Sequence, residues 1–156
     1  MSDRQEDGPY IVVGVDGSEP SKAALRWAAR LAPTLGARIR AVTAWAYPTA
    51  LGWTAGLPPE WSPGDDAEKG LTSAVDDVFG ANRPAGLRLL TQGGEATRVL
   101  LDASKGAAML VVGSRGHGGF VGLLLGSVSS QVAEHATCPV LVVHDGHSVA
   151  TAEAGS

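Results

Sequence analysis

The chain has 156 residues, of which 44% are hydrophobic and 18% charged, which is enough for one domain with a substantial core. The net charge is −4 and the Lys and Arg residues form no block, which argues against a nucleic-acid-binding protein. No apolar run approaches the ~20 residues of a membrane-spanning helix, and residues 1–9 contain no apolar signal core. A single cysteine, Cys138, excludes an internal disulfide and suits a reducing compartment, so we expect a cytoplasmic protein.

The first half of the chain predicts two strand–helix units joined by a long linker. Each expected strand is a short apolar, β-branched run, and each expected helix begins at a capping residue and ends at a glycine. In chain order these are the strand Tyr10–Val15, a helix from Ser18 to Gly36, the strand Arg38–Trp45, the linker 46–61, and a helix from Ser62 or Asp66 to Gly80. The linker has the length of a functional flap or a disordered segment. Its Trp53 and Trp61 indicate burial, either in packing or on a bound base.

The second half predicts three further strands separated by two helices. In chain order these are the strand Leu87–Thr91, the helix Glu95–Lys105, the strand Ala107–Val112, the helix Ser127–Ala136 and the strand Pro139–His144. The alternation of strands and helices predicts a parallel α/β sheet with helices on both faces, a three-layer Rossmann-like domain over residues 10–144. We expect residues 1–9 and 145–156 to be disordered tails, because both are polar.

The most informative motif follows the fourth expected strand. Gly113-Ser-Arg-Gly116 is followed after nine residues by Gly126-Ser127. Glycines allow positive φ and let backbone N–H groups approach an anion. A helix beginning at Ser127 would add unpaired N–H donors and a hydroxyl that can cap the helix or contact phosphate. The motif predicts a phosphate-binding loop; the alternative is a flexible surface connection, which the additional glycines between residues 118 and 122 would suit.

The loop after the first expected strand is the second candidate for a site. Ligands of parallel α/β sheets lie beyond the carboxyl ends of the strands, so this loop would meet the glycine motif if the two strands are neighbours. Asp16 could bind ribose hydroxyls or a cation, or could merely cap the first helix together with Ser18. Arg115 and His117 could screen phosphate charge or could simply be solvated.

With Val15-Asp-Gly-Ser18 after the first strand and the spaced glycines after the fourth, the chain resembles the universal stress protein family, and within it the ATP-binding branch. The resemblance covers residues 10–144. It implies an open sheet of strand order 3-2-1-4-5 of the adenine nucleotide alpha hydrolase-like type. It also implies ATP, with Mg²⁺ as a further candidate ligand, across the ends of the first and fourth strands. A homodimer that pairs the fifth strands (Pro139–His144) edge to edge is implied as well.

The resemblance also implies which residues contact the nucleotide. Asp16 matches an aspartate that contacts the nucleotide, Ala44 matches a position that lines the adenine, and Gly126 and Ser127 match the pair that holds phosphate. The full set of nucleotide-binding positions is Gly14, Val15, Asp16, Ala44, Gly113, Arg115, Gly116, Gly126, Ser127, Val128 and Ser129. No catalytic residue and no metal ligand is assigned.

Three functions fit these observations. The chain could be an ATP-binding regulator of a stress response, an enzyme that slowly hydrolyses ATP or phosphorylates itself, or a dimerisation module without nucleotide. The sequence contains no Gly-Lys-Ser/Thr phosphate loop, no G-x-G-x-x-G loop after the first strand and no acidic cluster for Mg²⁺, which argues against efficient catalysis. A receiver domain would need an acidic pair after the first strand, and Val13-Gly-Val-Asp16 does not supply it. The intact glycine spacing favours the regulator.

Overall fold

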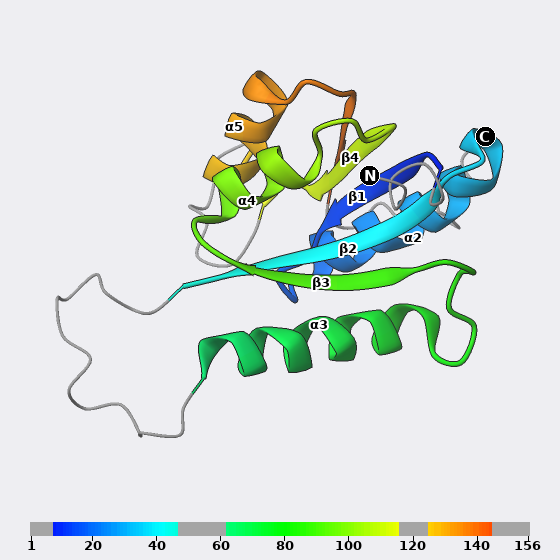
Figure 1. The fold of residues 1–156 in the computed structure, drawn as a ribbon, viewed down its shortest axis with the longest axis horizontal. Coiled ribbons are helices and arrows are strands. Elements are labelled where there is room, and N and C mark those ends of the chain that lie inside the picture. Colours follow the sequence, from blue (N-terminus) through cyan, green and yellow to red (C-terminus); the bar gives the residue numbers. More distant parts are fainter. Residues whose placement is uncertain (1–7, 47–61, 116–124, 145–156) are drawn as a thin grey trace, which may run out of the picture.

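Five parallel strands form one sheet at the centre of a three-layer α/β fold (Figure 1). The computed structural model describes residues 8–46, 62–115 and 125–144. The strands are β1 (Tyr10–Gly14), β2 (Arg38–Trp45), β3 (Arg88–Gly93), β4 (Met109–Gly113) and β5 (Val140–Val143). The helices are α2 (Glu19–Leu35), α3 (Pro63–Phe79), α4 (Ala96–Ala103) and α5 (Ser127–His135). The strand order β3-β2-β1-β4-β5 confirms the predicted fold class.

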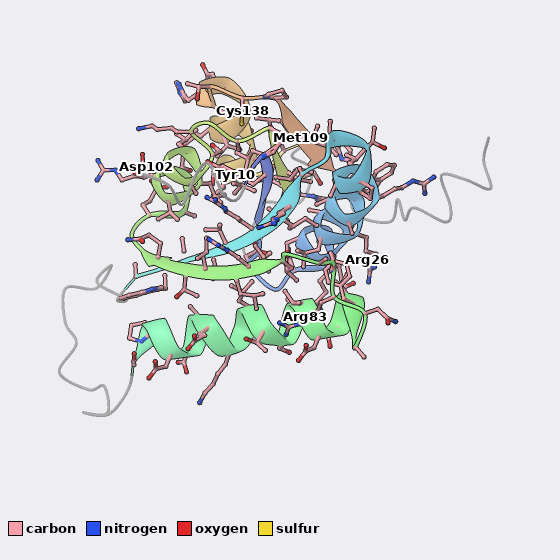
Figure 2. The ribbon with its side chains drawn as sticks, turned by 45° about the vertical axis from the view of Figure 1, so that its right-hand side comes forward. Tyr10, Arg26, Arg83, Asp102, Met109 and Cys138 are labelled. Carbon is pink, nitrogen blue, oxygen red and sulfur yellow. The ribbon has the colours of Figure 1, made fainter. Side chains whose placement is uncertain are left out.

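The two faces of the sheet carry two separate cores. Alternate side chains of β1 point to opposite faces, so Ile11 and Val13 pack under α2 while Tyr10 and Val12 pack under α4. Figure 1 shows α3 and α4 on opposite sides of β2 and β3, and Figure 2 shows the side chains that fill the layers between. Burial on both faces explains why β1 reads as a continuous apolar run. Each fully buried Val or Ile side chain contributes about 1.5–3 kcal/mol.

The helix boundaries follow the capping residues in the sequence. Ser18 caps α2, and Gly36 ends it with φ of 61°. Of the two expected starts of α3, Ser62 is the capping residue, since its hydroxyl accepts from the N–H of Asp65 at 3.2 Å. Glu95 caps α4 rather than belonging to it, and this helix ends at Ala103, two residues before the expected end at Lys105. None of the described helices is both long and apolar enough to cross a membrane.

β2 has the predicted bounds, whereas the bounds of β1, β3, β4 and β5 differ from the predicted ones by one or two residues. β1 ends at Gly14 instead of Val15, and β3 continues to Gly93 instead of ending at Thr91. β4 begins at Met109 rather than Ala107. The residue pattern could not set these ends, because pairing with the neighbouring strand decides where a strand stops. The linker of residues 47–61, with Trp53 and Trp61, and both expected tails except residues 8 and 9 lie outside the described ranges.

Candidate functional site

The carboxyl ends of β1 and β4 lie side by side at one edge of the sheet. The two strands are parallel neighbours, and Val13 pairs with Val111. The chain leaves β1 toward β2 on one side, whereas β4 is followed by β5 on the other side, so the strand order reverses between β1 and β4. In open α/β sheets this reversal opens a crevice beyond the strand ends, which is the usual ligand position. The two loops singled out by the sequence both begin there.

The loop after β1 is fixed by hydrogen bonds around Asp16. Its Oδ1 accepts from the N–H of Ser18 at 3.0 Å and from the hydroxyl of the same serine at 2.5 Å. That hydroxyl oxygen accepts in turn from the N–H of Ser21 at 3.3 Å, which caps α2. Between them Gly17 has φ of 84°, a conformation that strains any other residue. Asp16 therefore supports the helix cap, and it remains exposed at the sheet edge.

Gly113 ends β4 in direct contact with the first turn of α2. A Cβ at this position would lie 2.6 Å from the Cβ of Pro20, 2.8 Å from its carbonyl carbon and 3.0 Å from the backbone N of Ser21. Only glycine lets the two backbones come this close. The expectation of positive φ was wrong for Gly113 and for Gly126, whose φ is −73°. Position 113 requires glycine because β4 closely approaches α2 there.

Ser114 ties the end of β4 to the start of α5. Its N–H donates to the carbonyl of Val143 on β5 at 2.7 Å. Its carbonyl accepts from the N–H of Gly126 at 2.6 Å and from the Ser129 hydroxyl at 2.7 Å. The spacing analysis did not identify Ser114 as functional, although a serine directly after a strand-ending glycine was visible in the sequence. Both ends of the glycine-rich loop are thus held together.

Among the described residues, no side chain covers the start of α5 with a capping hydrogen bond. Gly126 occupies the N-cap position and no side chain caps the helix, whereas α2, α3 and α4 are each capped by a side chain. Ser127 is the first helical residue and not the cap that the sequence suggested. The first N–H groups of a helix have no intrahelical acceptor and carry the positive end of its dipole. The exposed Ser127 and the half-buried Val128 therefore present donors suited to an anion.

The remaining predicted residues lie near the carboxyl ends of β1, β2 and β4, and they differ in how far they are buried. Val15 is buried, its N–H donates to Val42 at 2.9 Å and its carbonyl accepts from the Thr43 hydroxyl at 2.8 Å. Gly14 faces α4, where a Cβ would lie 2.9 Å from Cδ1 of Leu100. The half-buried Ala44 packs on the α4 side of β2. Arg115 is exposed beside the loop, and Gly116 and His117 lie outside the described residues.

The Ser129 hydroxyl ties α5 to the end of β4, so we expect its removal to lower the stability of the protein. The residue is only 3% exposed, and its hydroxyl donates to the Ser114 carbonyl. We expect Ser129→Ala to lower the free energy of unfolding in urea by about 1 kcal/mol, because the carbonyl keeps its bond to the Gly126 N–H. Ser130→Ala, at an exposed position in the same helix, is the control and should change stability by less than ~0.5 kcal/mol. Equal stability of the two variants would contradict the tether.

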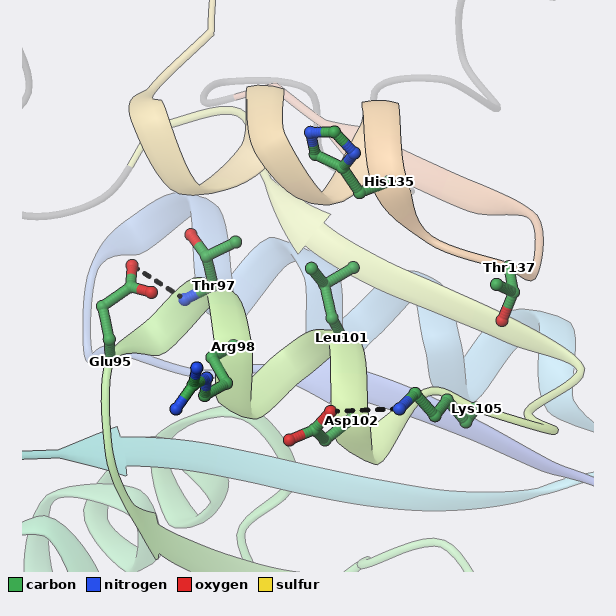
Figure 3. A pocket seen from close by; sticks show the side chains of 8 residues that line it. All are labelled: Glu95, Thr97, Arg98, Leu101, Asp102, Lys105, His135 and Thr137. Carbon is green, nitrogen blue, oxygen red and sulfur yellow. Dashed lines mark hydrogen bonds and ion pairs between the residues drawn. The ribbon is translucent and has the colours of Figure 1, made fainter.

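A separate groove of about 430 Å³ lies between α4 and α5 (Figure 3). Its lining carries charges of both signs, including the Asp102–Lys105 ion pair at 3.4 Å. The lining residues are Glu95, Thr97, Arg98, Leu101, Asp102, Lys105, His135 and Thr137, and none of them was predicted as a site residue. Within the described ranges no three His, Cys, Asp or Glu side chains group as metal ligands would.

Cys138 is a free cysteine and is half-buried. Partial burial raises the pKa of the thiol, against a weaker opposing hydrogen bond with Ser104. A raised pKa keeps the sulfur protonated near neutral pH, where a thiol is a poor nucleophile. Within the part of the chain that the structure describes, the net effect on Cys138 is a raised pKa, which does not favour a catalytic role.

Comparison with known proteins gives a consistent result. The model of the Universal stress protein family matches residues 10–144. The universal stress protein Rv2623 of Mycobacterium tuberculosis is 37% identical over 145 residues, which are 89% of this chain and 48% of that protein. The chain thus spans about half the length of the curated relatives it matches.

Solved structures share the fold. UspA from Lactobacillus plantarum superposes with a TM-score of 0.71 at 23% identity, over 86% of this chain and 97% of that one. A universal stress protein crystallised in complex with cAMP superposes with a TM-score of 0.64 at 28% identity, over 88% of this chain and 98% of that one.

Proposed function

Because the chain belongs to the universal stress protein family, we propose that it binds an adenine nucleotide, ATP in the first place, and acts as a nucleotide-dependent regulator of a stress response. The observation that carries this proposal is the N-terminus of α5, which no described side chain caps, at the point where the strand order reverses. A cytoplasmic location belongs to the same proposal, since a chain with one cysteine suits a reducing compartment.

In this proposal the phosphates lie at the start of α5. The N–H groups of Ser127 and Val128 donate to phosphate oxygens, and the Ser127 hydroxyl adds a further donor. Gly126 has no side chain, which leaves room for the anion beside the helix axis. Mg²⁺ would be held mainly by the phosphates and water, as is usual for this ion. Ser129, also predicted as a nucleotide contact, uses its hydroxyl to bind the Ser114 carbonyl, and the two serines fix the ends of the loop.

The nucleoside would extend from the phosphates toward β1 and β2. The Asp16 carboxylate is exposed at the sheet edge and would accept hydrogen bonds from ribose hydroxyls. This avoids placing it against the phosphates, where two negative charges would repel. Ala44 and the buried backbone of Val15 would lie beside the base. The relative crystallised with cAMP supports an adenine nucleotide as the ligand class.

Calorimetric titration of the purified protein with ATP, ADP, AMP and GTP in the presence of MgCl₂ tests the proposal. Mass spectrometry beforehand shows whether a nucleotide has co-purified. We expect micromolar binding with a preference for adenine over guanine. A folded, nucleotide-free protein that binds none of the four would contradict the proposal and favour a dimerisation module.

The proposal includes a homodimer formed by β5. This strand is at one edge of the sheet, where β4 is its paired neighbour, and Val140, Leu141 and Val142 are only half-buried. An edge strand with apolar side chains favours pairing with a second copy. Sedimentation velocity at micromolar concentration should show a dimer, and Val142→Lys should shift it to monomer. A wild-type monomer under these conditions would contradict the dimer.

A further inference from the structure

Four charged side chains form a row along α4. They follow one another at intervals of three, four and three residues, which places them on one face of a helix. Their signs alternate from the start of the row to its end, in the order Glu95, Arg98, Asp102 and Lys105. All four residues are exposed, and Figure 3 shows them spread from one end of α4 to the other. We call these four residues the charge row.

The backbone fixes the spacing of the charge row at both ends of α4. Glu95 is the N-cap residue, and its Oε2 accepts from the N–H of Thr97 at 3.3 Å. At the other end, the N–H of Ser104 donates to the Leu100 carbonyl at 3.0 Å, which continues the helical hydrogen bonding toward Lys105. With a rise of about 1.5 Å per residue, the row is about 15 Å long. The four charges therefore keep a fixed order and spacing along one line.

The charge row is complementary to itself when its direction is reversed. It is symmetrical about position 100, so reversal places Glu95 opposite Lys105. Reversal likewise places Arg98 opposite Asp102. Two copies of α4 that pack antiparallel across a two-fold axis would thus bring every carboxylate of the row against a cation. A two-fold interface needs a surface that matches itself in this way.

We propose that the charge row pairs antiparallel with the charge row of a second copy of this chain. Leu101 lies next to the centre of the row and is half-buried, so the leucines of the two copies would meet near the two-fold axis. Packed helices approach to about 8–10 Å between their axes, a distance that charged side chains on facing surfaces can bridge. This interface is separate from the proposed β5 pairing, because α4 packs on β1 and β2 while β5 is at an edge of the sheet.

The charges set the register of this interface more than its affinity. Asp102 and Lys105 form an ion pair at 3.4 Å within one chain, and their side chains are 64% and 70% exposed. Exposed ion pairs contribute little to stability, so exchanging this pair for pairs with the second copy is nearly neutral. Repulsion of like charges nevertheless excludes the parallel arrangement and shifted registers. We expect a Kd of roughly 0.1–1 mM, so that the pair is dissociated at the micromolar concentrations that test the β5 dimer.

Two complementary charge reversals test this pairing, both made in the parent variant Val142→Lys to remove the β5 dimer. Arg98→Glu and Asp102→Arg each place like charges opposite one another in a pair of identical copies. Each should weaken self-association at least about tenfold in sedimentation equilibrium at about 0.5 mM. An equimolar mixture of the two variants again has opposite charges at both positions, and its association should return to within about threefold of the parent. A helix damaged by either substitution would not recover on mixing.

Matched controls separate this pairing from an effect of overall charge. Arg26→Glu and Glu68→Arg make the same charge changes at exposed positions of α2 and α3, which pack on the other face of the sheet. Alone and mixed, these controls should associate like the parent. Controls that weaken and recover as the test variants do would contradict the proposal, because overall charge would then explain the result.

An independent readout locates the contact. The backbone amide signals of Thr97 and Leu101 in isotope-labelled Arg98→Glu should shift when unlabelled Asp102→Arg is added. The same comparison without Val142→Lys, followed as association beyond any β5 dimer, does not depend on that substitution. Failure of the β5 dimer alone would leave these expected outcomes unchanged. No self-association of the parent at about 0.5 mM, or no recovery in the mixture, would overturn the proposal.

Discussion

Gly126→Glu is expected to abolish binding of adenine nucleotides while the protein remains folded. The new carboxylate would stand at the N-cap of α5, where it could accept from the helix N–H groups that the phosphates are proposed to use. It would also repel the phosphates by its charge. We expect the affinity for ATP to fall at least about 100-fold, a loss of about 2.7 kcal/mol or more. Calorimetric titration of wild type and variant measures this directly.

The control for this substitution is Gly70→Glu. Gly70 lies in α3, is exposed, and has open space where a Cβ would be added. The substitution Gly70→Glu therefore introduces the same charge away from the site. The affinity of this variant for ATP should stay within about twofold of wild type. Circular dichroism of both variants verifies the fold. Wild-type affinity in Gly126→Glu would show that the start of α5 does not hold the phosphates.

Gly113→Val is expected to have the largest effect on stability. A Cβ at this position would approach the backbone of Pro20 to 2.8 Å and that of Ser21 to 3.0 Å, and backbone cannot yield as a flexible side chain can. Either β4 or the first turn of α2 must move, which we expect to cost about 3 kcal/mol or more. Urea unfolding of wild type and variant, compared at equal m-value, measures this loss in the free energy of unfolding. The same movement would separate the two loops and weaken nucleotide binding.

Gly70→Ala is expected to have the opposite effect on the stability of the protein. This exposed helix position is open, so alanine should stabilise the protein by about 0.5–1 kcal/mol. A destabilisation by Gly113→Val no larger than that of an ordinary surface substitution would mean that β4 and α2 are not in the contact described here.

Most of the fold was predictable because the local signals agree with each other. Ser18 and Gly36 bound α2 in the sequence and in the structure, and the apolar run of β1 is buried on both faces. Strand ends were less predictable. Gly93 belongs to β3 because it pairs with Trp45 of β2, and nothing in the local residue pattern indicates that partner.

The sequence predicted the motif that forms the candidate site, but it did not predict how the residues of that motif are arranged. The spaced glycines and the resemblance both pointed to the loop after β4, and the structure places the end of β4, where this loop begins, beside β1. The physical reason for Gly113 is different from the predicted one, because it depends on Pro20, more than ninety residues earlier in the chain. The tether through Ser114 also depends on a tertiary contact and therefore gave no periodic signal.

Mapping ATP binding by the backbone amide signals of the isotope-labelled protein tests the central claim most directly. The account predicts that the largest shifts fall on Ser127 and Val128 at the start of α5, with smaller ones on Asp16 and Gly113. Shifts concentrated instead on Lys105 and His135 would place the nucleotide in the groove between α4 and α5 and contradict the account.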